Sequence, residues 1–128
     1  MTHHSRLFKI VIDVPAASLD SELAFWQAAS GLPLPPNPRF PEYYGSGLLH
    51  GQEFALLVQR LGDGLPRVHI DIHTDDLEAE VTRLEGLGAE RVKLIHYWWV
   101  MRDPAGLLFC VLPDRSGELT DANSHRWD

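Results

Sequence analysis

Apolar residues occupy every second position from Val68 to Ile72 within residues 67–76, RVHIDIHTDD. This period of two is typical of a half-buried β-strand, whose successive side chains point to opposite faces. The polar face of the predicted strand carries three side chains of the metal-binding type, His69, Asp71 and His73. Residues two apart on a strand are separated by roughly 6.6 Å, so these three cannot all bind one ion without ligands from other strands.

The same pattern occurs earlier in the chain. Residues 10–14, IVIDV, align with residues 68–72, VHIDI, and the segments that follow align without a gap. Each of these following segments has apolar residues at positions i, i+4 and i+7, which form one stripe of an amphipathic helix. The stripes are Leu19, Leu23 and Trp26 in the first copy and Leu77, Val81 and Leu84 in the second. The chain therefore contains a duplicated strand–helix unit.

Capping residues indicate where the two helices begin and end. Ser18 is expected to cap the first helix, and Asp75 with Glu78 three residues later resembles a capping box for the second. Gly31 and Gly88 follow the helical patterns, where glycine favours a C-terminal stop.

Strand-like segments follow each helix. Residues 31–41, GLPLPPNPRFP, contain too many prolines for a central strand and predict a loop with at most a short edge strand. Residues 43–50 and 53–61 predict a hairpin joined near Gly51 and Gln52, and the second half predicts strands over 89–96, 97–102 and 107–112. The last two strands are joined by the turn DPAG at 103–106.

These elements predict an α+β fold. It consists of a single domain, residues 1–128, with two βαβββ modules at 7–61 and 66–113 and a polar C-terminal tail at 114–128 that lies on the surface, docked or not. We expect the modules to form one curved mixed sheet, with helices on one face and a cleft on the other. The residues expected to face the helices are Ile10, Ile12, Val14, Val68, Ile70, Ile72, Phe109 and Val111. Those expected to face the cleft are Val11, Asp13, His69, Asp71, His73, Leu108, Cys110 and Leu112.

Composition narrows the class of protein. The formal net charge is −7 and the 11 Lys and Arg residues are scattered, which argues against a nucleic-acid partner. The single cysteine, Cys110, cannot form an internal disulfide, and no apolar run is long enough for a membrane span or a signal peptide. We therefore expect a cytoplasmic protein with no membrane partner. His3 and His4 are expected to lie in an unstructured terminus.

Three segments carry a resemblance to a known family. They are FKIVIDVP with LAFWQAASGLPL in the first half, RVHIDIHTDDLEAEVTRLEGLGAERV at the start of the second, and WWVMRDPAGLLFCVLP at its end. Together they resemble the vicinal oxygen chelate (VOC) superfamily, and more closely its glyoxalase-like domains. The resemblance implies the predicted fold. It leaves the activity open, because the superfamily includes glyoxalase I, ring-cleaving dioxygenases, epimerases, thiol transferases and bleomycin-binding proteins that catalyse nothing.

The resemblance also implies where metal ligands would lie. In this chain the corresponding positions are Val11, Gln59 or a near neighbour, His69 and Cys110. Only His69 matches outright, because valine binds no metal, cysteine replaces the usual glutamate, and an amide oxygen is a weak donor. The expected site is therefore metal-free, with a divalent metal such as zinc as the alternative.

Our leading interpretation is a small-molecule-binding cleft. The residues expected to contact the ligand are His69, Gln59, Asp71, Cys110 and Trp98, with His69 as the candidate catalytic acid or base. His73 is expected to be solvated. Two alternatives are a metal-dependent lyase or dioxygenase with an atypical site, and a drug- or toxin-sequestering protein of the bleomycin-resistance type. Whether the chain is an enzyme stays open. The resemblance also implies a homodimer.

Overall fold

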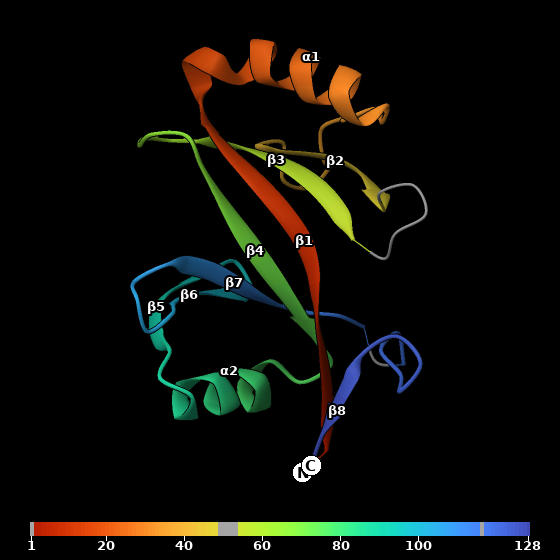
Figure 1. Cartoon of the computed structure of the whole chain (residues 1–128), viewed down its shortest axis with the longest axis vertical. Helices are drawn as coiled ribbons and strands as arrows, with labels where there is room; N and C mark the ends of the chain where they lie inside the picture. Colours follow the sequence, from red (N-terminus) through yellow and green to blue (C-terminus); the bar gives the residue numbers. More distant parts are fainter. Residues whose placement is uncertain (1, 49–53, 116) are drawn as a thin grey trace. The chain divides into compact units, whose positions relative to one another are not determined.

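A computed structural model describes residues 2–48, 54–115 and 117–128 of the chain (Figure 1). The helices are α1 (Leu19–Ser30) and α2 (Leu77–Gly86), and a short 3₁₀ turn, Ala16–Ser18, precedes α1. The strands are β1 (His3–Pro15), β2 (Tyr43–Leu48), β3 (Ala55–Leu61), β4 (Arg67–Thr74), β5 (Glu90–Ile95), β6 (Trp98–Arg102), β7 (Leu108–Pro113) and β8 (His125–Trp127). The predicted α+β class is confirmed. Within the described residues, no helix is long and apolar enough to cross a membrane.

The chain divides into two compact units. The α1 unit is Lys9–His69, and the α2 unit is Met1–Phe8 together with Ile70–Asp128. Both boundaries fall inside strands, because β1 and β4 each contribute residues to both units. The first eight residues therefore belong with the second half of the sequence.

The α1 unit packs one helix on a three-stranded arrangement. Its strand β3 pairs in parallel with β1 and antiparallel with β2. The apolar stripe of α1 contacts a buried core, which consists of Ile12, Val14, Leu19, Leu34, Leu56 and Val58. Gly31 ends α1 with a left-handed φ of 73°, as predicted. The proline-rich segment forms one isolated bridge, Pro36 to Tyr44, in agreement with the expected short edge pairing. The predicted turn near Gly51 and Gln52 lies outside the described residues.

The α2 unit repeats this plan with more strands. Its strand β7 pairs in parallel with β4 and antiparallel with β6, and β6 pairs antiparallel with β5. The buried core under α2 consists of Val81, Leu84, Met101 and Val111. Helix α2 is capped by Asp76, whose side chain accepts from the backbone N–H of Ala79 at 3.0 Å. The predicted cap Asp75 was therefore wrong by one residue, because its carboxylate instead accepts hydrogen bonds from His4.

The two ends of the chain pair with each other in the α2 unit. Strand β8 runs antiparallel to the start of β1, with His3 opposite Trp127 and Ser5 opposite His125 (Figure 1). His3 and Ser5 are both buried. The prediction of an unstructured N-terminus was wrong, because polar residues that alternate in and out of a strand look like a solvated tail. The C-terminal segment also docks, and its Leu119 is buried.

Two residues of β4 depart from the expected burial. Ile72 packs with the α2 core, as predicted for the face that meets the helices. Val68 and Ile70 share that alternation but are 55% and 38% exposed. They belong to neither buried core, because α1 packs on the α1-unit core and α2 packs beside Ile72 and Val111.

Candidate functional site

A buried aspartate holds the first histidine of β4. In the α1 unit, Nδ1 of His69 lies 2.6 Å from Oδ2 of Asp13. The Asp13 side chain is 2% exposed and that of His69 is 11% exposed. Such a short bond to a buried carboxylate fixes the ring and places the proton on Nδ1 when the imidazole is neutral. Nε2 is then the nitrogen with a lone pair for proton exchange or coordination.

Strand alternation explains why Asp13 is available for this bond. Its neighbours Ile12 and Val14 pack into the core beneath α1, so Asp13 lies on the opposite face of β1. Val11 lies on that same face and is completely buried. The sequence placed Asp13 and His69 on one face but did not pair them, because the strand order that brings β1 to the start of β4 is not visible in the alternation.

A row of polar side chains continues from Asp13 across the sheet of the α1 unit. Gln59 is opposite Asp13 in the β1–β3 pairing, and Tyr43 is opposite Gln59 in the β2–β3 pairing. Residues that are opposite each other on neighbouring strands point to the same face. The Gln59 amide Nε2 donates to the Tyr43 hydroxyl at 3.4 Å. The amide oxygen of Gln59 and the dyad of Asp13 and His69 therefore lie on one face.

The second carboxylate oxygen of Asp13 can accept a further hydrogen bond on this face. Oδ1 of Asp13 is buried and has no hydrogen-bond partner among the described residues. Arg67 lies nearby, with its Nε 3.7 Å from Oδ2, but its side chain is 48% exposed and the pair is weak. An unsatisfied buried oxygen costs about 1–3 kcal/mol, so a bound donor group would be stabilised here. Arg67 was not among the residues predicted for this site.

The other proposed ligand-contacting residues lie in the α2 unit. Asp71 is 4% exposed and lies directly opposite Cys110 in the β4–β7 pairing, while His69 precedes Asp71 by two residues on the same strand. Trp98 is 6% exposed, and the rings of His96 and Tyr97 each lie 5.1 Å from its ring. Trp98 therefore presents little surface to a ligand.

His73 is a correction to the sequence analysis. It was expected to be solvated, but it is 7% exposed, and its Nδ1 lies 2.6 Å from Oδ1 of Asp114. Its ring also packs 4.6 Å from that of Phe8. Asp114 follows β7, the parallel partner of β4, so the two strands end side by side and bring the pair together.

The residues match a metal site only in part. Val11 is apolar and fully buried, so one of the four positions that the resemblance implies cannot bind a metal. His69 fits better, because a carboxylate on Nδ1 is the usual support of a metal-bound imidazole. His69, Asp71 and Cys110 are donors of the types found at metal centres, and this nitrogen, oxygen and sulfur set suits zinc better than magnesium or calcium.

Comparisons with known proteins agree on a single fold. The family model described as glyoxalase-like domain matches residues 9–112. No curated protein matches the chain.

Two of the similar solved structures are methylmalonyl-CoA epimerases. The enzyme from Mycobacterium tuberculosis is 16% identical, with a TM-score of 0.55 over 84% of this chain and 87% of its own. A variant of the Streptomyces coelicolor enzyme, in complex with 2-nitronate-propionyl-CoA, is 16% identical, with a TM-score of 0.57 over 90% and 98%.

A third is 2,2',3-trihydroxybiphenyl 1,2-dioxygenase from Sphingomonas wittichii strain RW1. It is 14% identical, with a TM-score of 0.56 over 94% of this chain and 44% of the dioxygenase. At these identities the likeness concerns the fold.

Proposed function

The chain belongs to the glyoxalase-like domain family of the VOC superfamily, and we propose that Asp13 and His69 form the polar centre of a small-molecule site. The observation that carries this proposal is the 2.6 Å bond between His69 Nδ1 and the buried Asp13 carboxylate. An imidazole held in one tautomer can hydrogen-bond a ligand or exchange a proton with it through Nε2.

The surrounding residues support binding of a polar small molecule. Oδ1 of Asp13 is buried without a described partner, and Gln59 and Tyr43 add an amide and a phenol on the same face of the α1 unit. In this proposal Asp13 orients His69, and His69 contacts the ligand. Asp71, Cys110 and Trp98 of the α2 unit stay predictions as secondary contacts, and Trp98, which is 6% exposed, would contribute the least. The site as proposed works without a metal.

A ligand screen followed by variants tests the proposal. Methylmalonyl-CoA is the first probe, since structural neighbours bind it or act on it, and small carboxylic acids and thioesters follow. Ligands that raise the melting temperature are then incubated with the protein in D₂O, and deuterium uptake at carbon is followed by NMR. Uptake indicates proton transfer, whereas stabilisation without uptake or product indicates sequestration, as in the bleomycin-resistance type.

The decisive variant is His69→Gln. It should abolish any deuterium uptake and weaken binding about tenfold, because glutamine fills similar space but exchanges no proton at this position. Asp63→Asn is the matched control for loss of a polar group, because Asp63 is exposed and belongs to the same unit. Ligands that stabilise wild type and His69→Gln equally would contradict the proposal.

A metal-dependent lyase or dioxygenase is the second candidate. The observation in its favour is again the carboxylate behind His69, together with Asp71 and Cys110 as donor residues. A bound zinc would polarise a ligand oxygen, and His69 would hold it through Nε2. Elemental analysis of untagged protein tests this candidate. About one equivalent of metal, lost in His69→Ala but retained in Asp63→Asn, would favour it over the metal-free site.

We further propose a homodimer, which the family resemblance supports, and a cytoplasmic location, which the single cysteine favours. Sedimentation velocity at micromolar concentration tests the dimer, and a sedimentation coefficient of a 14.5 kDa monomer at all concentrations would contradict it.

A further inference from the structure

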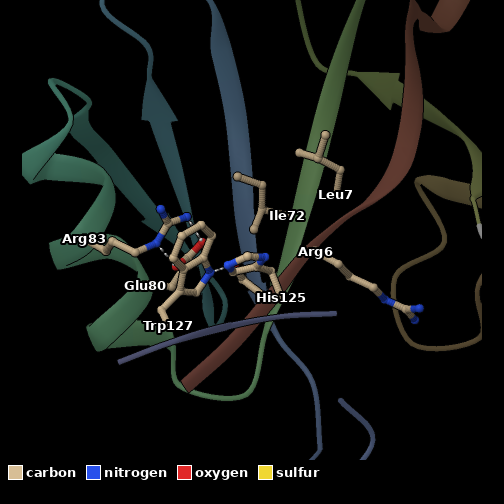
Figure 2. A pocket seen from close by; sticks show the side chains of 8 residues that line it. Arg6, Leu7, Ile72, Glu80, Arg83, His125 and Trp127 are labelled. Carbon is tan, nitrogen blue, oxygen red and sulfur yellow. Dashed lines mark hydrogen bonds and ion pairs between the residues drawn. The ribbon is translucent and has the colours of Figure 1, made fainter. Parts of the chain in front are cut away.

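A concave surface lies in the α2 unit, and its lining residues do not include those of the proposed site. It is a groove of about 230 Å³ lined by residues of β1, β4, α2 and β8 (Figure 2). A water molecule occupies about 30 Å³ in the liquid, and drug-sized pockets begin near 300 Å³, so the groove suits a small fragment.

Three of the eight residues that line this groove have apolar side chains. Leu7 is 55% exposed, which is unusual for a leucine in the interior of a strand, and Ile72 and Trp127 lie beside the same space. The Trp127 ring is fixed from two sides, since its Nε1 donates to Ser5 Oγ at 2.9 Å and the His125 ring packs 4.0 Å away. These contacts give the groove a rigid apolar wall.

The one acidic residue that lines the groove is already neutralised by its neighbours. Glu80 is fully buried, and its carboxylate accepts from Nε and Nη2 of Arg83 at 2.7 and 2.9 Å and lies 2.9 Å from Nε2 of His3. Burial alone would raise the pKa of Glu80, but the hydrogen bonds from Arg83, His3 and Ser5 outweigh it and hold the pKa below its usual range. The negative charge of Glu80 is therefore balanced by these buried partners.

Two nitrogen-bearing side chains retain hydrogen-bonding capacity at the groove. The Arg83 guanidinium lies 3.7 Å above the Trp127 ring and uses Nε and Nη2 for Glu80. Within the described part of the chain, neither Nη1 of Arg83 nor the ring nitrogens of His125 have a hydrogen-bond partner. Figure 2 shows Arg83 and Trp127 gathered around Glu80, whereas Arg6 points away from them.

We propose that this groove binds small amphiphilic carboxylates. The apolar part of the ligand packs against Leu7, Ile72 and Trp127, and its carboxylate accepts hydrogen bonds from Arg83 Nη1 and His125. Charge complementarity favours this class, because a carboxylate accepts stronger hydrogen bonds from these two donors than a neutral carbonyl does, and a cation would face the guanidinium. The groove shares no residue with the Asp13 and His69 site, so either proposal can fail alone.

Hexanoate and hexanamide test the proposal as matched probes of equal length. In two-dimensional ¹H–¹⁵N NMR at pH 7, hexanoate should shift the Trp127 indole and Leu7 amide signals with a millimolar dissociation constant. Hexanamide should bind at least fivefold more weakly, because it lacks the anionic acceptor. Acetate, which lacks the apolar part, should also bind at least fivefold more weakly.

His125→Phe is the matched variant. It keeps a ring packed on Trp127 but removes both ring nitrogens, and it should weaken hexanoate binding at least threefold. The control is Arg126→Gln, which removes a cation from the next residue of β8 that does not line the groove. Its hexanoate affinity should match wild type.

Three outcomes would overturn the proposal. The first is equal affinity for hexanoate and hexanamide, and the second is an equal loss of hexanoate affinity in Arg126→Gln and His125→Phe. The third is an unshifted Trp127 indole signal at hexanoate concentrations up to 50-fold above about 1 mM. Each is independent of folding, since both variants alter exposed side chains and the amide spectrum reports the folded state directly.

Discussion

Histidine–carboxylate pairs occur in two regions of the molecule and differ in what surrounds them. In the α1 unit, Asp13 binds His69 and keeps a second, buried oxygen without a described partner. In the α2 unit, Glu80 binds His3 and Arg83 with both oxygens. In the first pair, Oδ1 of Asp13 retains hydrogen-bonding capacity for a ligand. In the second pair both carboxylate oxygens already have partners, and the bonds join segments that are far apart in the sequence.

The separation in sequence between the bonded residues supports this distinction. The bond between His3 and Glu80 joins residues 77 apart, and the bond from His4 to Asp121 joins residues 117 apart. We call His3, His4, Asp75, Glu80 and Asp121 the terminal clasp, because their bonds tie β1 to α2 and to the C-terminal segment. We infer that the clasp serves stability and the Asp13–His69 pair serves ligand binding, and three predictions test that contrast.

The largest effect is expected at the centre of the clasp. Glu80→Ala should lower the free energy of unfolding by about 3–5 kcal/mol, because it leaves His3 without its partner and Arg83 unpaired. Glu78→Ala, on the same helix but 70% exposed, should cost about 1 kcal/mol or less. Urea unfolding followed by circular dichroism measures both. Equal losses would show that the buried network contributes no special stability.

A smaller effect on stability, but a clear one on binding, is expected at Asp13. Asp13→Asn should change the free energy of unfolding by about 1 kcal/mol or less, since an amide can still hydrogen-bond His69. The same variant should weaken binding of the ligands found in the thermal-shift screen about tenfold, because His69 loses the charged group that orients it. If instead stability falls sharply and affinity is unchanged, Asp13 belongs with the structural pairs.

The smallest effect is a pH dependence of the clasp. Hydrogen bonds to Asp121 and Asp75 raise the pKa of His4 above 6.5. The stability that His4 contributes is therefore complete below about pH 6.5 and is lost as the pH rises through the raised pKa. Between pH 6 and pH 9, wild type should lose more stability in urea than His4→Gln does. Parallel curves for wild type and His4→Gln would contradict the prediction.

The duplicated pattern explains how much of the fold could be predicted. Alternation in residues 68–72 and the helical stripes at Leu77, Val81 and Leu84 are local signals, and the structure places those three residues at or beside the α2 core. Gly31 likewise ends α1 because a left-handed φ is a local requirement. Most features that a few neighbouring residues determine were therefore predicted correctly, and the exception is the cap at Asp75, whose carboxylate is bonded to the distant His4.

Features that depend on distant partners were not. His3 and His4 were read as a solvated end, because their strand partner β8 lies more than 100 residues away. His73 was expected to be solvated, because its partner Asp114 follows another strand. Asp13 was placed on the correct face without its bond to His69 for the same reason. The local pattern predicts which face a side chain takes, but not which neighbour it meets there.

Because β1 pairs with β8, the two ends of the chain lie next to each other. The Thr2 hydroxyl donates to the Asp128 carboxylate at 3.1 Å, so a short peptide could join the two ends. In such a closed chain, Ile70–Asp128 would run directly into Met1–Phe8, and each compact unit would be one uninterrupted stretch of sequence. A circular permutant reopened at the exposed loop 62–64 between β3 and β4 would then be expected to fold.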